Sequence, residues 1–455
     1  LPTSAPVEDE KLLLKLDWNI NDQHRAALVY NYNDGFLIDQ SDESSRNLTL
    51  SNHFYKKGAR LDAIVGSLYS DWSDNFSTEV RIGHTKLDNL QESVDSASGF
   101  AEVQIGSLPG GGNIFLGPDD SRQSNDLNWD STTLKVAGTY YLEDHVITAG
   151  YEYESLDVFN LFMQHTIGEY RFGGDRNRPS GLDDFESGIV DDIYYNNSAG
   201  TNNPDDAAAS FSYATHAVYV QDEVVIDDLT LMFGLRYDWI SSSDKPNFNQ
   251  NFEDRYGFSN QNTFDGEGVL QPRLGFNYAL NDAVEFRGGL GLYQGGNPNV
   301  WLSNSYSNDG ITNLDTLRRH VQIPDANGNP IPGLISGDGR AIYNPLNQQV
   351  QEVANNNPTF GDEPSTNAIA EDFKLPTEWK YNVGVTYATE DDYIFQADFL
   401  YTKKQDSANV IDASIEQVGT VVDGRPIYDK AVVRTNDDGS VVRRNFLRND
   451  FILEN

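Results

Sequence analysis

Hydrophobic residues occupy every second position in several stretches of this chain. Between Leu229 and Trp239 the odd positions carry Leu, Leu, Phe, Leu, Tyr and Trp, whereas the even positions include Thr230, Arg236 and Asp238. A period of two is that of a β-strand, because successive side chains point to opposite faces. The pattern therefore predicts strands with one apolar face and one polar face.

The predicted strands are joined in pairs by very short turns. Six such turns are expected, at 21–24, 73–75, 143–145, 227–228, 281–282 and 389–392. Far longer polar spans separate the pairs, at 33–47, 88–130, 157–210, 241–270, 295–375 and from 405 onward. Outer-membrane barrels show this alternation, with short periplasmic turns and long extracellular loops. The predicted fold is all-β, an antiparallel up-and-down transmembrane β-barrel with long extracellular loops.

The composition agrees with this fold and excludes several other classes of protein and site. No run of apolar residues approaches the roughly 18 that a membrane helix needs, so a helical membrane protein is excluded. The 455 residues contain no cysteine, which excludes disulfide frameworks, thiolate zinc sites and thiol nucleophiles. Aromatic residues near predicted strand ends, such as Trp18, Trp72 and Trp239, suit the interfacial girdles of a barrel.

The charge balance is strongly acidic. With 70 acidic and 32 basic residues the formal net charge is −38, which disfavours nucleic acid as a partner because phosphates require a basic surface, and no nucleic acid is expected. Acidic pairs fall in the expected loops, at Asp119–Asp120, Asp183–Asp184, Asp191–Asp192, Asp205–Asp206 and Asp437–Asp438. Solvation of exposed loops is the favoured explanation for these pairs. The alternatives are a structural Ca²⁺ between loop carboxylates, or an acidic vestibule for a cationic ligand. No other cofactor is expected.

Eight charged residues on the polar faces of the predicted strands are the candidate functional residues. We expect them to face the barrel lumen: Glu79, Arg81, Glu152, Arg236, Asp238, Arg273, Glu285 and Arg287. Charges on the inner wall avoid lipid, and there they can bond a plug or line a substrate path. Mutual ion pairing that only hydrates the lumen is an equally weighted alternative.

No motif indicates catalysis. The seven histidines, at 24, 53, 84, 145, 165, 216 and 320, show no metal-ligand spacing, and the metal question stays open. The glycines of Gly288–Gly291 lie within a predicted strand with no helix after it, so close packing is favoured over dinucleotide binding. The stretch Asp325–Asn329 faintly resembles a calcium loop but lacks the later Glu. We expect a protein that is not an enzyme.

Several motifs resemble those of a known family. Tyr219–Glu223 and Leu231–Asp238 resemble the paired-strand signature of TonB-dependent outer-membrane receptors. Further motifs resemble the Oar-like subgroup, in order and over nearly the whole chain: Lys15–Asp22, Phe159–Phe162, Gly168–Phe172, Gln271–Tyr278, Arg287–Tyr293 and Pro298–Asn304. The resemblance implies nutrient uptake through a Gram-negative outer-membrane barrel that an N-terminal plug blocks and the TonB system opens.

The chain departs from that family pattern at both ends. A barrel strand is expected almost at once, with no signal peptide, plug or TonB-contacting segment before Leu12. The chain stops at Asn455 after a strand-like stretch at 445–453, without an aromatic-ended final strand. Plugged transporters have about 22 strands, whereas six hairpins supply twelve. The expected organisation is one partial barrel over 1–455, with the plug and the C-terminal strands absent from this chain.

Three classes of function remain open. The leading one is the barrel portion of an active transporter, whose partners are outer-membrane lipid, the TonB system acting through a plug outside this chain, and an unidentified extracellular substrate. The second is a passive porin or a surface adhesin on a similar barrel, which a plug encoded upstream would exclude. The third is a soluble β-rich binding or polysaccharide-degrading protein, which partition of the native protein into membranes would exclude.

Overall fold

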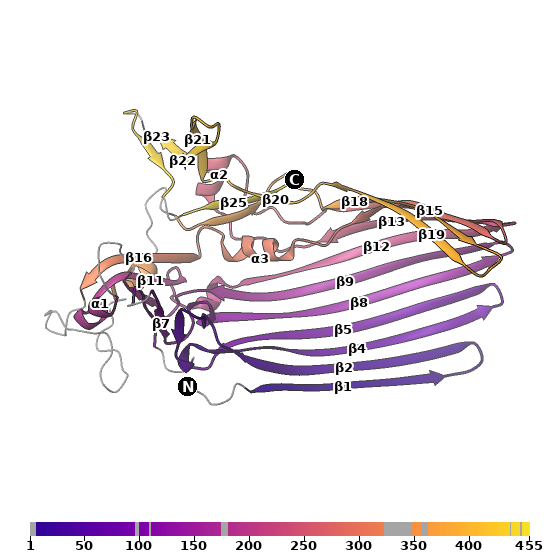
Figure 1. Cartoon of the computed structure of the whole chain (residues 1–455), viewed down its shortest axis with the longest axis horizontal. Helices are drawn as coiled ribbons and strands as arrows, with labels where there is room; N and C mark the ends of the chain where they lie inside the picture. The colour runs from indigo at the N-terminus through magenta and orange to yellow at the C-terminus, as the bar shows by residue number, and fades with distance from the viewer. Residues whose placement is uncertain are drawn as a thin grey trace.

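One antiparallel sheet of twelve strands dominates the molecule (Figure 1). The computed structural model describes residues 6–95, 100–108, 111–173, 181–322, 347–355, 363–436, 438–445 and 448–455. The twelve strands, in their order across the sheet, are β1 (Val7–Asn19), β2 (His24–Asp39), β4 (Tyr55–Ser73), β5 (Phe76–Ser93), β8 (Ser124–Leu142), β9 (His145–Met163), β12 (Ala209–Ile226), β13 (Leu229–Ser241), β14 (Gly268–Asn281), β15 (Val284–Gln294), β18 (Thr377–Ala388) and β19 (Ile394–Gln405).

All six expected short turns are confirmed. They join β1 to β2, β4 to β5, β8 to β9, β12 to β13, β14 to β15 and β18 to β19, and they lie together at one end of the sheet (Figure 1). The glycines of Gly288–Gly291 lie within β15. A Cβ added to Gly288 would come within 2.5 Å of the Phe276 ring on β14, so this glycine permits close packing of neighbouring strands.

The pairing register puts the expected apolar positions on one face. Leu235 of β13 lies opposite Val220 of β12 and Pro272 of β14. The expected apolar positions of the neighbouring strands fall on this same face. Leu235 is 45% exposed and Val220 is 47% exposed. A broad exposed apolar face is unfavourable in water and suits the hydrocarbon of a bilayer.

The strands are longer than the hydrophobic pattern indicates. Polar spans were expected from 33, 88 and 157, yet β2 continues to Asp39, β5 to Ser93 and β9 to Met163. Backbone ladder bonds do not require apolar side chains, so pairing extends past the part that needs an apolar face. The boundaries of those three expected loops were therefore wrong.

The twelve-stranded sheet has two edges in the part of the chain that the structure describes. β1 and β19 each pair with one neighbour only, β2 and β18 respectively. Every residue of both edge strands is exposed. The strands of this chain thus form an open sheet.

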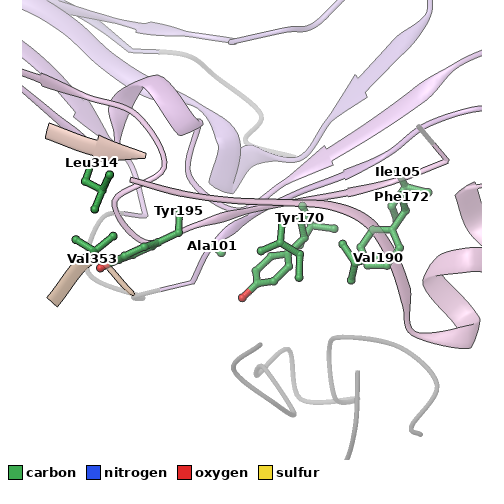
Figure 2. Packing of buried hydrophobic residues seen from close by; sticks show 10 residues of the cluster. Ala101, Ile105, Tyr170, Phe172, Val190, Tyr195, Leu314 and Val353 are labelled. Atoms are coloured by element: carbon green, nitrogen blue, oxygen red, sulfur yellow. The ribbon is translucent and has the colours of Figure 1, made fainter. Parts of the chain in front are cut away.

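A second sheet is built from the long connections, at the end of the molecule opposite the short turns (Figure 1). Its strands, in spatial order, are β16 (Asn313–Gln322), β11 (Ile189–Ser198), β10 (Glu169–Phe172), β6 (Glu102–Ile105), β7 (Asn113–Leu116) and β3 (Asn47–Thr49). Figure 2 shows the apolar core beside these strands, in which Ile105, Phe172 and Val190 are buried. The sequence predicted these spans as long loops and gave no indication that they pair into a sheet of their own.

Shorter elements complete the long connections. The remaining strands are β17 (Thr366–Ile369), β20 (Asn409–Asp412), β21 (Ile415–Thr420), β22 (Pro426–Lys430), β23 (Val432–Thr435), β24 (Val441–Arg443) and β25 (Asp450–Glu454). The helices are α1 (Gly181–Ser187), α2 (Gln250–Tyr256), α3 (Asn299–Ser307) and α4 (Asn347–Asn355), with 3₁₀ turns η1 (Ser51–His53), η3 (Asp120–Arg122) and η4 (Pro204–Ala207). No helix within the described ranges is long and apolar enough to cross a membrane.

The expected strand at 445–453 is only partly present and does not belong to the barrel sheet. Its described part, β25, pairs in parallel with β17 and antiparallel with β20. Residues 446–447 lie outside the described part of the chain. Beside β25, the fully buried Arg444 donates hydrogen bonds to Glu363 and Asp450, which fixes this region to the chain before β17.

Candidate functional site

The polar face of the twelve-stranded sheet carries all eight of the charged residues singled out in the sequence. Register places them in a continuous band: Arg81 lies opposite Lys135, Lys135 opposite Glu152, and Arg236 opposite Gln271. Charged side chains collect on this face because the other face is apolar along the same strands.

The first cluster of the band lies on β5, β8, β9 and β13. Glu79 accepts hydrogen bonds at 2.8 Å from both Arg81 and Lys135. Arg236 donates to Glu152 at 2.7 Å. Sequence reasoning missed Lys135, although Leu134 and Val136 flank it and the period of two marks it as a polar-face residue.

The middle of the band continues across β13, β14 and β15. Arg236 also contacts Asp238 at 2.8 Å, and Asp238 accepts a hydrogen bond from Gln271. Arg273 donates to Gln271 at 3.3 Å, and its guanidinium lies 4.5 Å from the centre of the Tyr293 ring. Asp238 is almost fully buried, so its two donors replace the water it lacks.

The last part of the band lies on β14, β15, β18 and β19. Arg287 donates to Asp398 at 2.6 Å and to Thr386 at 2.7 Å. Glu285 accepts from Asn277 at 3.0 Å. Among the residues that the structure describes, no ion pair is recorded for Glu285 or for Arg273, whereas each of the other six has one.

Two cavities open on the polar face. The first has a volume of about 270 Å³, and its lining includes Arg81, Lys135, Glu152 and Arg236. The second has a volume of about 530 Å³ and lies farther from the short turns, where β8, β9 and β12 meet α3. Both are lined by Glu154 and Thr215, so the charged cavity and the second cavity are adjoining.

The second cavity is mainly aromatic and aliphatic on the sheet side and polar on the helix side. Its lining includes Leu127, Trp129, Leu156, Val158, Phe211 and Tyr213 from the strands, and Asn297, Asn299, Val300 and Ser303 from the segment of α3. A volume of this size with a few convergent polar groups is typical of a small-molecule site. The sequence signals for it were the motifs Pro298–Asn304 and Phe159–Phe162, the second of which contains Asn160 of the cavity lining.

Three contacts hold α3 over this cavity. The Phe211 ring stacks on the Tyr306 ring with centres 4.8 Å apart. Tyr213 donates a hydrogen bond to Asn299 at 2.9 Å, and Asn160 donates to Ser303 at 2.8 Å. The long connection after β15 therefore folds over the polar face of the sheet.

Histidines and carboxylates from the long connections form two compact groups. One contains Asp42, His53 and Asp119, the other Asp120, His165 and Glu169. Sequence spacing did not reveal them because their members come from different connections. Of the acidic pairs predicted from the sequence, Asp119–Asp120 contributes one residue to each group. Asp437 and the stretch Asp325–Asn329 lie outside the described residues.

In the second group the charged side chains are paired with one another. Burial alone would lower the pKa of His165, but the carboxylates of Asp120 and Glu169, each 2.9 Å from Nε2, outweigh it and raise the pKa to about 9. Arg171 donates to Glu169 at 3.0 Å. Burial and the nearby Glu169 and Asp120 charges raise the pKa of Glu102 well above its usual range.

Three solved structures show what this chain is similar to. The outer membrane transporter YddB from Escherichia coli matches 98% of this chain, with a TM-score of 0.56 and 12% identity. The siderophore receptors PirA from Acinetobacter baumannii and from Pseudomonas aeruginosa match 99% and 93% of it, with 14% and 11% identity and TM-scores of 0.49 and 0.44. The chain spans 43%, 48% and 51% of these three structures, respectively.

Sequence comparison supplies the family. No curated protein matches the chain. The family model described as outer membrane beta barrel domain matches residues 2–437, which is nearly all of it. The chain therefore belongs to the outer membrane beta-barrel domain family and is a protein of the Gram-negative outer membrane.

Proposed function

We propose that this chain is the barrel portion of a TonB-dependent active transporter of the Oar-like subgroup, which imports a nutrient that its sequence does not identify. The observation that carries the proposal is the pair of adjoining cavities that share Glu154 and Thr215. An aromatic-lined cavity next to a charged one forms the start of a path along the polar face. Membership of the outer membrane beta-barrel domain family excludes the alternative of a soluble β-rich binding or polysaccharide-degrading protein.

Closure of the barrel requires more strands than these twelve. The edges of β1 and β19 present N–H and C=O groups that find no water in a bilayer, at a cost of several kcal/mol for each unsatisfied group. In our proposal, further strands join these two edges, and a plug sits against the charged band. The chain covers 43% of YddB, which leaves room for further strands in a complete barrel of about 22.

Orientation follows from the lengths of the connections. We propose that the short turns face the periplasm and that the six-stranded sheet with α3 lies outside the cell. The aromatic-lined cavity would then be the first part of the path that an external solute meets.

Solute depletion tests active transport even though the substrate is unidentified. Cells that carry the complete natural protein are grown in a rich medium, and the medium is compared by mass spectrometry with that of deletion cells. We expect at least one solute to be depleted only when both the protein and TonB are present. Depletion that persists without TonB, together with stable ion conductance of the purified protein in planar bilayers, would assign a passive porin instead.

The cavity is tied to this activity by a matched pair of variants. Trp129→Ala removes an aromatic wall of the 530 Å³ cavity, whereas Ile82→Ala shortens a side chain that is 58% exposed on the apolar face. Depletion should slow in the first variant and stay unchanged in the second. Equal behaviour of the two would contradict the proposed path.

A further inference from the structure

Three side chains from two distant segments meet where the long connections pack on the strand ends. Asp42 follows β2, His53 ends η1, and Asp119 is the N-cap of η3. One atom from each, an imidazole nitrogen or a carboxylate oxygen, lies within 4.8 Å of the others. One imidazole and two carboxylates form a ligand set that suits divalent transition-metal ions.

The hydrogen bond at Nδ1 of His53 leaves Nε2 as an acceptor beside the carboxylate of Asp42. The side chain is fully buried, and Nδ1 lies 3.0 Å from the carbonyl oxygen of Gly117. A carbonyl only accepts, so Nδ1 carries the hydrogen, and Nε2 of the neutral ring carries a lone pair. Nε2 nevertheless lies 3.1 Å from a carboxylate oxygen of Asp42. Two acceptors at this distance need a cation near them, either a metal ion or a second proton.

The two carboxylates of the group match the charge of a divalent ion. Asp42 and Asp119 together carry two negative charges, and Asp119 is only 5% exposed. A divalent ion bound to neutral His53 neutralises both carboxylates.

The partner of Nδ1 also has the form of a support for a metal ligand. Ligating histidines usually donate their other N–H to a carboxylate or a backbone carbonyl, which fixes the ring orientation. Gly117 has a φ of +81°, and an added Cβ would lie 2.2 Å from the backbone oxygen of Ala101. Only glycine fits this turn, which aims the carbonyl at His53.

The neighbouring histidine group already contains a fixed cation. His165 lies 2.9 Å from carboxylates of both Asp120 and Glu169, but Arg171 already places its guanidinium on Glu169. A fixed positive charge opposes the entry of a metal ion. His165 is therefore a matched control, with the same residue type in the same part of the molecule.

We propose that Asp42, Nε2 of His53 and Asp119 bind one divalent transition-metal ion of the zinc class. The ion would join the connection between β2 and β4 to the connection between β5 and β8, and so hold the outer sheet on the strand ends. The imidazole ligand separates this site from the calcium expected in acidic loops, because Ca²⁺ takes oxygen ligands. The site is structural and does not depend on the transport function proposed above.

Metal titration of the complete natural protein tests the proposal. The protein is purified in detergent, stripped with a chelator and titrated with Zn²⁺ by calorimetry and with Co²⁺ by visible absorption. We expect one saturable site, which Ca²⁺ at equal concentration does not compete for. His53→Gln should weaken Zn²⁺ binding at least about 100-fold, whereas His165→Gln should change it less than about threefold.

The variant Asp42→Asn distinguishes the loss of a metal ligand from a loss of binding caused by misfolding. The Asp42 side chain is 49% exposed, so this change removes a ligand charge without disturbing packing. Weaker Zn²⁺ binding with an unchanged unfolding midpoint of the metal-free protein supports the site. Absence of saturable Zn²⁺ binding, or binding that His165→Gln removes and His53→Gln spares, overturns it.

Discussion

Replacement of Leu235 by arginine tests which face of the twelve-stranded sheet meets lipid. Leu235 lies on the apolar face opposite Val220 and Pro272. The next residue, Arg236, points to the other face, where it contacts Glu152 and Asp238. An arginine at 235 cannot reach those carboxylates and would have to enter hydrocarbon.

The expected cost depends on the depth of Leu235 in the membrane. The residue lies six positions after Leu229, which begins β13 beside a short turn. With a rise of about 3.4 Å per residue and a tilt of about 45°, Leu235 stands roughly 14 Å from that turn, near the middle of an apolar band about 25 Å tall. Arginine at this depth destabilises a barrel by about 2–4 kcal/mol.

Gln221→Arg is the matched control for this prediction. Gln221 lies opposite Gly234 on the polar face, one position from Leu235 in register, so its arginine would stay hydrated. We expect a change of about 0.5 kcal/mol or less in the control. Urea unfolding of both variants of the complete protein in liposomes measures the difference. Equal costs for the two variants, or no cost for Leu235→Arg, would refute the assignment of faces.

Four further outcomes are expected. Arg444→Leu should lower the free energy of unfolding by about 1–3 kcal/mol, because the buried carboxylates of Glu363 and Asp450 lose one of their two arginine partners and keep Arg255, and an unchanged free energy in urea unfolding would contradict this. An epitope inserted at Thr201 should be labelled on intact cells, and labelling only after permeabilisation would reverse the orientation. Arg273→Gln should slow solute depletion while the unfolding free energy changes by about 0.5 kcal/mol or less, and Arg287→Gln should slow it less. Residues 1–455 expressed alone should give no stable conductance in planar bilayers, whereas a cooperative conducting monomer would show that the edges of β1 and β19 can close on each other.

The sequence predicts the strands of the barrel sheet well because their signal is local. An apolar residue at every second position is visible within a single short stretch, and it identified both the short turns and the face of each strand. Polar strand ends beyond the membrane give no such signal, since β5 continues to Ser93 through six residues of which only Leu90 is apolar.

The outer sheet and the histidine groups depend on pairs that are distant in sequence. β11 pairs with β16 across a long separation in sequence, and β10 pairs in parallel with β6. His53 and Asp119 lie 66 positions apart, so their approach depends on how two connections pack. No spacing rule within one sequence can supply such contacts, whereas Lys135 was available from its place between Leu134 and Val136.

The charged band on the polar face separates into residues that neutralise one another and residues that do not. Exposed ion pairs such as Arg81 with Glu79, or Arg287 with Asp398, contribute about 0–1 kcal/mol, so they neutralise and hydrate this face more than they stabilise the fold.

Arg273 and Glu285 differ, because among the described residues neither has an ion pair, and their contacts are with neutral groups. A charge without a counter-ion keeps its attraction for an outside group. We therefore propose that Arg273 and Glu285 are the residues of the band whose charge is available to a plug, while Arg81, Glu152 and Arg236 line the charged cavity of the proposed path.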